Sequence, residues 1–161
     1  MTWQTEITPM VRYIIGDIST TPTYTDAKIQ NAVLISAQLM TKEIDFGKTY
    51  VVDVGNSGLT PDPTDATRDD AFISLVSLKT AWLIANSELR TYALTGMKVT
   101  DGPSTIDTTS MATQMKNVAA SASKAYNDAA RQYTLGNAIG AKIVTGPYTT
   151  NNGNYSNLLG G

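Results

Sequence analysis

A heptad spacing of apolar residues between positions 71 and 92 constrains the fold of this chain more than any other feature. The residues recur at alternating intervals of four and three, in the order Ala71, Leu75, Leu78, Trp82, Ala85, Leu89 and Tyr92. This spacing places them along one stripe of an α-helix, where they can pack against another helix. Asp69 and Asp70 at the start and Gly96 at the end favour these helix limits. We expect this helix to be the central one.

A second stripe of the same kind predicts a partner helix over about 110–135. It consists of Met111, Met115, Val118, Ala122, Ala125 and Ala129, with Tyr126 and Tyr133 flanking it and Gly136 ending the helix. Alanines in a helix contact allow two backbones to approach closely. We therefore predict a bundle core formed by these two helices and centred on Leu75, Leu78, Trp82, Leu89, Met115 and Val118.

Two more helices are expected before position 50. The first runs over about 8–17, with Thr8 as N-cap and Pro9 in its first turn, and its apolar face is Ile7, Val11, Ile14, Ile15 and Ile18. The second runs over about 26–45 and is capped by Thr25 or Asp26. It is apolar over a wide arc, so it is either central or covered by a neighbouring subunit. Trp3 either anchors a partner or covers the bundle.

The β-branched stretch 49–54 reads as a strand, and the Gly- and Pro-containing segment 55–65 as a loop. One short strand needs a partner, in this chain or in another. Residues 97–109 form a linker with a turn at Asp101-Gly102-Pro103. The composition then changes at 137, where Gly and Asn become frequent, so we divide the chain into a helical domain, 1–136, and an extended C-terminal tail, 137–161.

Composition argues against catalysis. The chain contains neither Cys nor His, which removes thiolate chemistry, the usual general base near neutral pH and the commonest metal ligands. The acids between Asp62 and Asp70 lack the register of a Ca²⁺ loop and read as charge at a helix N-terminus. We predict solvent-exposed surface positions for Lys79, Arg68 and Arg90. We expect no catalytic residue, no cofactor and no metal.

Charge and hydropathy limit the partners. The formal net charge is −2, which argues against tight electrostatic binding of DNA. There is no apolar run long enough to cross a membrane and no signal peptide, so we expect synthesis in the cytoplasm and no membrane partner.

The order of these elements resembles that of the head–tail connector, or adaptor, proteins of tailed bacteriophages. A short helix leads to a helix starting at Tyr24-Thr25-Asp26, and a strand at Tyr50-Val51-Val52 precedes an apolar third helix. The segment from Lys98 to Asp107 then precedes a last helix. The resemblance covers about residues 5–136. It implies a mainly α fold, a small bundle of about four helices with a short β strand or hairpin insertion and an extended C-terminal tail.

The resemblance also implies a role at the head–tail junction of a virion. Family members form a ring, usually of twelve subunits, between the portal protein and a downstream tail or stopper protein, and DNA passes through the lumen. The tail would contact the portal or a neighbouring subunit through its apolar residues, which are Ile143, Val144, Pro147, Tyr148, Tyr155, Leu158 and Leu159. No catalytic residues come with this family.

Three alternatives stay open. Another neck or tail-completion protein would share the composition but lie elsewhere in the virion. A small carboxylate-dependent enzyme, such as a glycosidase, requires two acids that converge in a cleft. A helical DNA-binding subunit of a packaging machine would bind DNA in a salt-dependent way.

Overall fold

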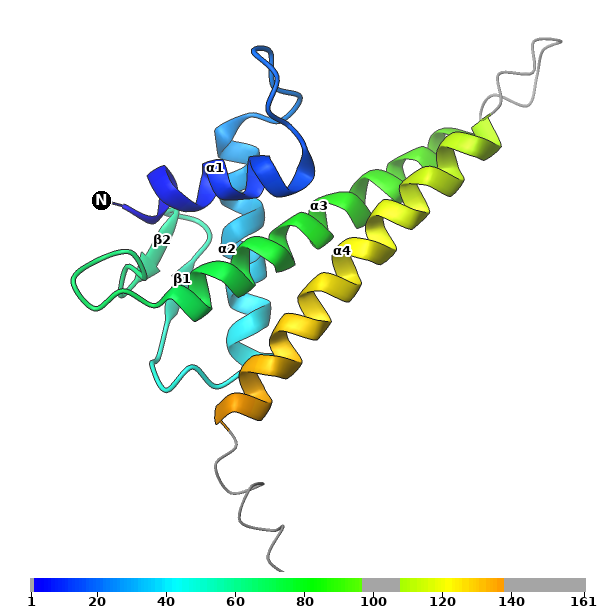
Figure 1. The fold of residues 1–161 in the computed structure, drawn as a ribbon. Coiled ribbons are helices and arrows are strands. Elements are labelled where there is room, and N and C mark those ends of the chain that lie inside the picture. Colours follow the sequence, from blue (N-terminus) through cyan, green and yellow to red (C-terminus); the bar gives the residue numbers. More distant parts are fainter. Residues whose placement is uncertain (1, 97–107, 138–161) are drawn as a thin grey trace, which may run out of the picture.

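The computed structural model describes residues 2–96 and 108–137, which form a mainly helical fold with one β-hairpin (Figure 1). The elements of this part are α1 (Trp3–Ile15), α2 (Asp26–Glu43), β1 (Val51–Asp53), β2 (Gly58–Thr60), α3 (Asp70–Gly96) and α4 (Thr108–Asn137). The predicted fold class, a small helical bundle with a hairpin insertion, is confirmed. Most of the linker and the whole tail beyond Asn137, with its predicted contact residues, lie outside the described residues.

α1 begins five residues earlier than the sequence predicted. Thr2, not Thr8, is the N-cap, and Pro9 lies inside the helix rather than in its first turn. The reason is a contact distant in sequence, because the backbone N–H of Trp3 donates to Asp62 Oδ2 at 2.9 Å and so satisfies one of the unpaired donors at the helix start. Trp3 itself is 2% exposed and belongs to the core, which settles its role within this chain.

α1 also ends earlier than predicted. Gly16 adopts the left-handed conformation, with φ of 75°, and the backbone N–H groups after the helix turn back to the carbonyls of Arg12 and Tyr13. The predicted apolar face is therefore split. Ile7 and Val11 are fully buried, whereas Ile14 and Ile18 remain 45% and 64% exposed.

α2 agrees with the prediction at its start, where Thr25 is the cap and accepts a hydrogen bond from the Lys28 N–H at 3.3 Å. It ends at Glu43, two residues before the predicted limit. Its wide apolar arc is mostly buried between α1 and α3, with Ile29, Val33, Leu34 and Met40 inaccessible to solvent.

The strand expected over 49–54 pairs within the chain. β1 and β2 form an antiparallel hairpin in which Val52 lies opposite Leu59. β2 falls in the segment that we predicted to be a loop, so that prediction is wrong. Leu59 is 5% exposed, and its burial in the core fixes the second strand although Gly and Pro residues surround it.

The core lies among α1, α2, the hairpin and the first half of α3, rather than between α3 and α4 as the heptad stripes predicted. α3 and α4 do pack along each other as a long antiparallel pair (Figure 1). However, the described part of α4 contributes only Ala119 and Tyr126 to the buried hydrophobic residues. α4 also continues through Gly136 to Asn137 instead of stopping before it.

An aromatic cluster holds the end of α4 against the segment between α2 and β1. The rings of Tyr50 and Phe72 stack with centroids 4.0 Å apart, and Phe46 lies 5.1 Å from Phe72 and 5.3 Å from Tyr133. Pairs of this geometry each add about 0.5–1.5 kcal/mol beyond the burial of their area.

The acids between positions 62 and 70 accept backbone N–H groups at the starts of two helices rather than one. Asp69 caps α3 by accepting the N–H of Phe72 at 3.0 Å, and it also accepts the Tyr50 hydroxyl at 2.8 Å. Asp62 instead accepts the backbone N–H of Trp3 at the start of α1. Asp70 pairs with Arg68.

Candidate functional site

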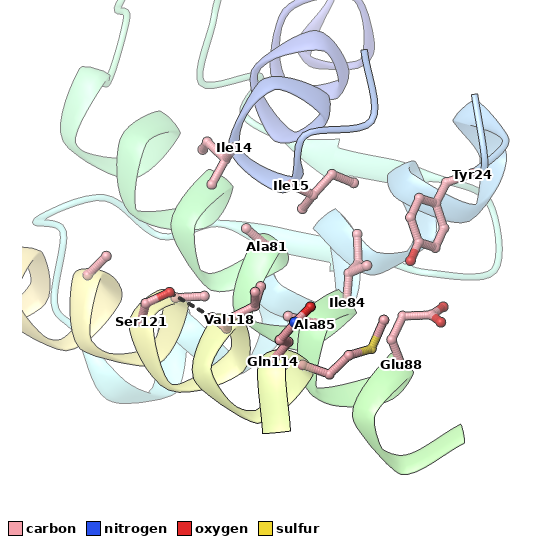
Figure 2. Close-up of a pocket in the computed structure, with 13 residues that line it drawn as sticks. Ile14, Ile15, Tyr24, Ala81, Ile84, Ala85, Glu88, Gln114, Val118 and Ser121 are labelled. Carbon is pink, nitrogen blue, oxygen red and sulfur yellow. Dashed lines mark hydrogen bonds between the residues drawn. The ribbon is translucent and has the colours of Figure 1, made fainter. Parts of the chain in front are cut away.

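The described residues enclose an apolar groove of about 590 Å³ between the end of α1 and the two long helices (Figure 2). We call it the apolar groove. It is lined by Ile14 and Ile15 of α1, Tyr24 before α2, Ala81, Ile84, Ala85 and Glu88 of α3, and Gln114, Met115, Val118, Ser121, Ala122 and Ala125 of α4. Its volume lies within the range of roughly 300–1,000 Å³ typical of ligand sites.

The groove arises from small side chains on two adjacent helices. Ala81 and Ala85 of α3 lie near Ala122 and Ala125 of α4, so that these helix surfaces present little side-chain volume. Ile14, at the end of α1, forms part of another wall of the groove, as Figure 2 shows. The result is a hollow that no described side chain fills.

Several side chains in and beside the groove are apolar and yet exposed. Val118 is 59% exposed and Ile14 is 45% exposed. Tyr13 of α1 and Ile18, three residues after the end of this helix, are 77% and 64% exposed. Exposed apolar side chains that line a groove suit the binding of an apolar partner.

The polar groups of the groove are few and sit among apolar ones. Glu88 pairs with Lys28, whose Nζ lies 3.7 Å from Glu88 Oε1. The Ser121 hydroxyl donates to the backbone carbonyl of Val118 at 2.9 Å (Figure 2). This lining suits apolar side chains and offers no set of groups for acid–base chemistry.

A second candidate lies between α2, α3 and α4, where Lys79 is buried. Its Nζ lies 2.7 and 2.8 Å from the two carboxylate oxygens of Glu43 and 4.9 and 4.5 Å from the ring centroids of Trp82 and Tyr126. The Tyr126 hydroxyl completes the cluster by donating to Glu43 Oε2 at 2.7 Å. The prediction that Lys79 is solvated is wrong, since this residue is 3% exposed.

The Lys79 cluster has the chemistry of a structural contact. A catalytic lysine acts through an unprotonated amine, whereas Lys79 Nζ is held by a carboxylate and two ring faces. Burial raises the pKa of Glu43, but the hydrogen bonds from Lys79 and Tyr126 outweigh that effect and hold this pKa below its usual value. Glu43 is thus ionised at neutral pH, the opposite of what a general acid requires.

The Glu43 carboxylate is also relevant to the alternative that this chain is a small carboxylate-dependent enzyme. A polar pocket of about 480 Å³ between the end of α2 and Tyr50 is lined by two acids, Glu43 and Asp45. Glu43 is paired with Lys79, and Asp45 accepts the backbone N–H of Gly47 at 2.8 Å. The lowered pKa of Glu43 does not suit the general acid of a two-carboxylate glycosidase.

The six residues predicted as bundle core are found in different surroundings. Leu75 is 3% exposed and lies in the core, whereas Leu78 and Trp82 are partly buried against it. Leu89 is partly buried on α3, and Met115 lies in the apolar groove. The placing of Val118 in the core is wrong.

The stripe that α4 actually buries is rotated from the predicted one. It follows Met115, Ala119, Ala122, Tyr126, Ala129 and Tyr133, again in steps of four and three. Tyr126 is 3% exposed and stacks on Trp82 with centroids 6.1 Å apart. The two tyrosines that we predicted to flank the stripe therefore belong to it, and their ring size was the available signal in the sequence.

Within the part of the chain that the structure describes, there is no cluster of three or more acidic, His or Cys side chains that could hold a metal ion. None of the described helices is long and apolar enough to cross a membrane. Comparisons with protein-family models, curated proteins and solved structures find no match for this chain.

Proposed function

We propose that this chain is a structural virion protein, a head-to-tail adaptor that forms a ring between the portal and the tail of a phage and lets DNA pass through its lumen. The observation that supports this best is the order of elements. A short helix, a long helix, a β-hairpin and two long helices follow one another, which is the order that the resemblance to connector proteins implies.

The surface of the fold suits repeated contacts between subunits. A ring requires a heterologous interface, in which two different patches of one subunit meet their complements on the neighbours. The apolar groove is one such patch. The exposed Ile35 and Leu39, one turn apart on α2, are 41% and 45% exposed and form a second.

The charge of the chain suits a channel through which DNA slides. The formal net charge of −2 offers few cations to bind phosphates. Arg68, one of the basic residues considered for a positive face, pairs with Glu6 and Asp70. Weak contacts with the DNA would let it slide, and many weak contacts between subunits would together hold the ring. Both properties suit a passive channel.

The tail provides the test of partner binding. We expect a variant without residues 140–161 to keep its helical circular dichroism spectrum but to lose binding to the purified portal protein of the same phage. The full chain and a variant in which only Ile143 and Val144 are changed to Ser are the matched comparisons. Portal binding by the truncated chain with unchanged affinity would refute the role assigned to the tail.

A different neck or tail-completion protein is the remaining alternative of the same class. Its position in the particle distinguishes it from an adaptor, because an adaptor lies directly below the portal. A cross-link from this chain to the portal in intact particles supports the adaptor, and cross-links to tail proteins alone support the alternative.

A further inference from the structure

We propose that the apolar groove is a docking site for this chain's own segment around Tyr155, Leu158 and Leu159. The proposal concerns the chain before it meets any partner, and it does not depend on the adaptor role. Three observations support it: the lining of the groove, the length of chain that follows α4, and the distribution of apolar residues in that length.

The groove selects an apolar occupant of limited size. Its walls are formed mainly by aliphatic side chains and alanines, and two of its polar members, Glu88 and Ser121, have partners within the chain. An extended segment that presents two leucines and a tyrosine matches this surface, because the burial of apolar area provides the attraction.

The distance along α4 decides which apolar residues of the tail can reach the groove. α4 ends at Asn137, and its groove residues run from Ala125 back to Gln114. At 1.5 Å per residue the near edge lies about 18 Å from the helix end and Val118 about 28 Å. Ile143 and Val144 span at most roughly 25 Å from Asn137, so they stop short of Val118 even when fully extended.

The later residues reach the centre of the groove without strain. A segment of about 21 residues, which is the separation of Leu158 from Asn137, spans up to roughly 70 Å when fully extended, so its length is ample for the distance to Val118. A tether of this kind raises the effective concentration of a ligand at its site, up to the millimolar range.

The tether favours docking within one chain over docking between chains. At micromolar protein concentration a second copy presents its tail at about a thousandth of the effective concentration of the tethered one. Charge does not oppose docking in either case, since Lys142 is the only charged side chain between 138 and 161. The segment thus meets no repulsion from Glu88 at the groove.

The absence of Cys in the chain permits a clean cross-linking test. A disulfide forms readily only between residues whose Cα atoms come within about 7 Å. We would compare V118C/L158C, which joins the groove to the segment, with I35C/L158C. Ile35 is also apolar and exposed, but it lies on α2 and does not line the groove. Circular dichroism establishes that both variants fold.

We expect V118C/L158C to form an intrachain disulfide at least ten times faster than I35C/L158C during mild oxidation of dilute protein. Adding A85E, which places a carboxylate on the groove floor, should reduce the rate to that of the control pair. Equal rates for the two pairs would overturn the proposal. Disulfides formed mainly between chains, seen as dimers on a non-reducing gel, would also overturn it and assign the groove to a second copy.

Discussion

At the scale of single residues, Lys79 is the most demanding position in the described chain. A buried ammonium is tolerated only when it is paired and hydrogen-bonded. Glu43, Tyr126 and Trp82 supply that environment from three different helices. The cluster therefore reports directly on the packing of α2, α3 and α4.

Removing the acid should cost more than removing the base. Glu43→Ala leaves the Lys79 ammonium buried without its partner, and we expect a loss of about 2 kcal/mol in the free energy of unfolding. This value is below the usual 3–5 kcal/mol because the Glu43 side chain is 46% exposed. Lys79→Met leaves no buried charge and should cost less. Urea unfolding measures both.

The exposed pair between Lys28 and Glu88 gives the matched control. Lys28→Met should change the free energy of unfolding by less than about 0.5 kcal/mol, because exposed ion pairs contribute little. A larger loss in Lys79→Met than in Glu43→Ala would contradict the described arrangement of the cluster.

Acid should destabilise the fold, and the range is set by its carboxylates. Hydrogen bonds from the backbone N–H groups of Thr23 and Tyr24, with the Arg12 charge, hold the pKa of Asp17 below its usual value, and Arg68 does the same for the pKa of Glu6. A lowered pKa in the folded state means that the ionised form stabilises the fold. That stability is complete above the unfolded pKa of about 4 and is lost as the pH falls through the folded pKa.

We therefore expect the free energy of unfolding to be nearly constant between pH 5.5 and 7 and to fall below about pH 4. The chain has no histidine to titrate in the upper range. Asp17→Asn should be less stable at pH 7 and should show a smaller decline in acid. Urea unfolding at a series of pH values tests this, and a wild-type stability that is the same at pH 3 as at pH 7 would exclude the assigned role of these carboxylates.

At the scale of elements, the start of α3 follows from a local signal, whereas the start of α1 does not. Asp69 marks the start of α3 in the sequence and in the structure. The start of α1 depends on Asp62, which is 59 residues away from Trp3. No local sequence pattern could therefore predict where α1 starts. β2 is hidden for the same reason, because burial of Leu59 outweighs the surrounding turn residues.

The rotation of the α4 stripe also has a physical reason that lies outside α4. Two heptad stripes were available in its sequence, one of small residues and one that includes Tyr126 and Tyr133. Trp82, Lys79 and the Phe46 ring provide partners for the tyrosines, and the larger aromatic area gained on burial selects that stripe. Val118 is left at the surface, where it lines the apolar groove.

Two neighbouring residues of α4 test this rotation. Ala119 is 6% exposed, so Ala119→Leu should overpack the contact with α3 and cost about 1–3 kcal/mol. Val118→Leu should change the stability by less than about 0.5 kcal/mol, since Val118 is mainly exposed. Thermal unfolding of the two variants compares them directly. A larger loss of stability in Val118→Leu than in Ala119→Leu would show instead that α4 buries the stripe predicted from its alanines.

At the scale of the whole molecule, the fold combines a compact body with a long antiparallel helix pair that extends past it (Figure 1). The fold class was predictable because four helical periodicities and one β-branched stretch each fit a known element. The apolar groove was not predictable from the sequence, since it depends on how the end of α1 lies against α3 and α4. The proposals use both parts, the exposed apolar surface for ring contacts and the groove for the chain's own tail before it meets a partner.

The proposed adaptor role places this chain in a phage particle, and immunogold electron microscopy of phage particles from the cells that produce the chain tests that role most directly. An antibody raised against residues 1–137 would be applied to intact particles and to particles from which the tails have been removed. We predict gold particles at the head–tail junction, with stronger labelling once the tail is absent. Label distributed along the tail, or no label on either kind of particle when the protein is present in the lysate, would contradict the proposed position and function.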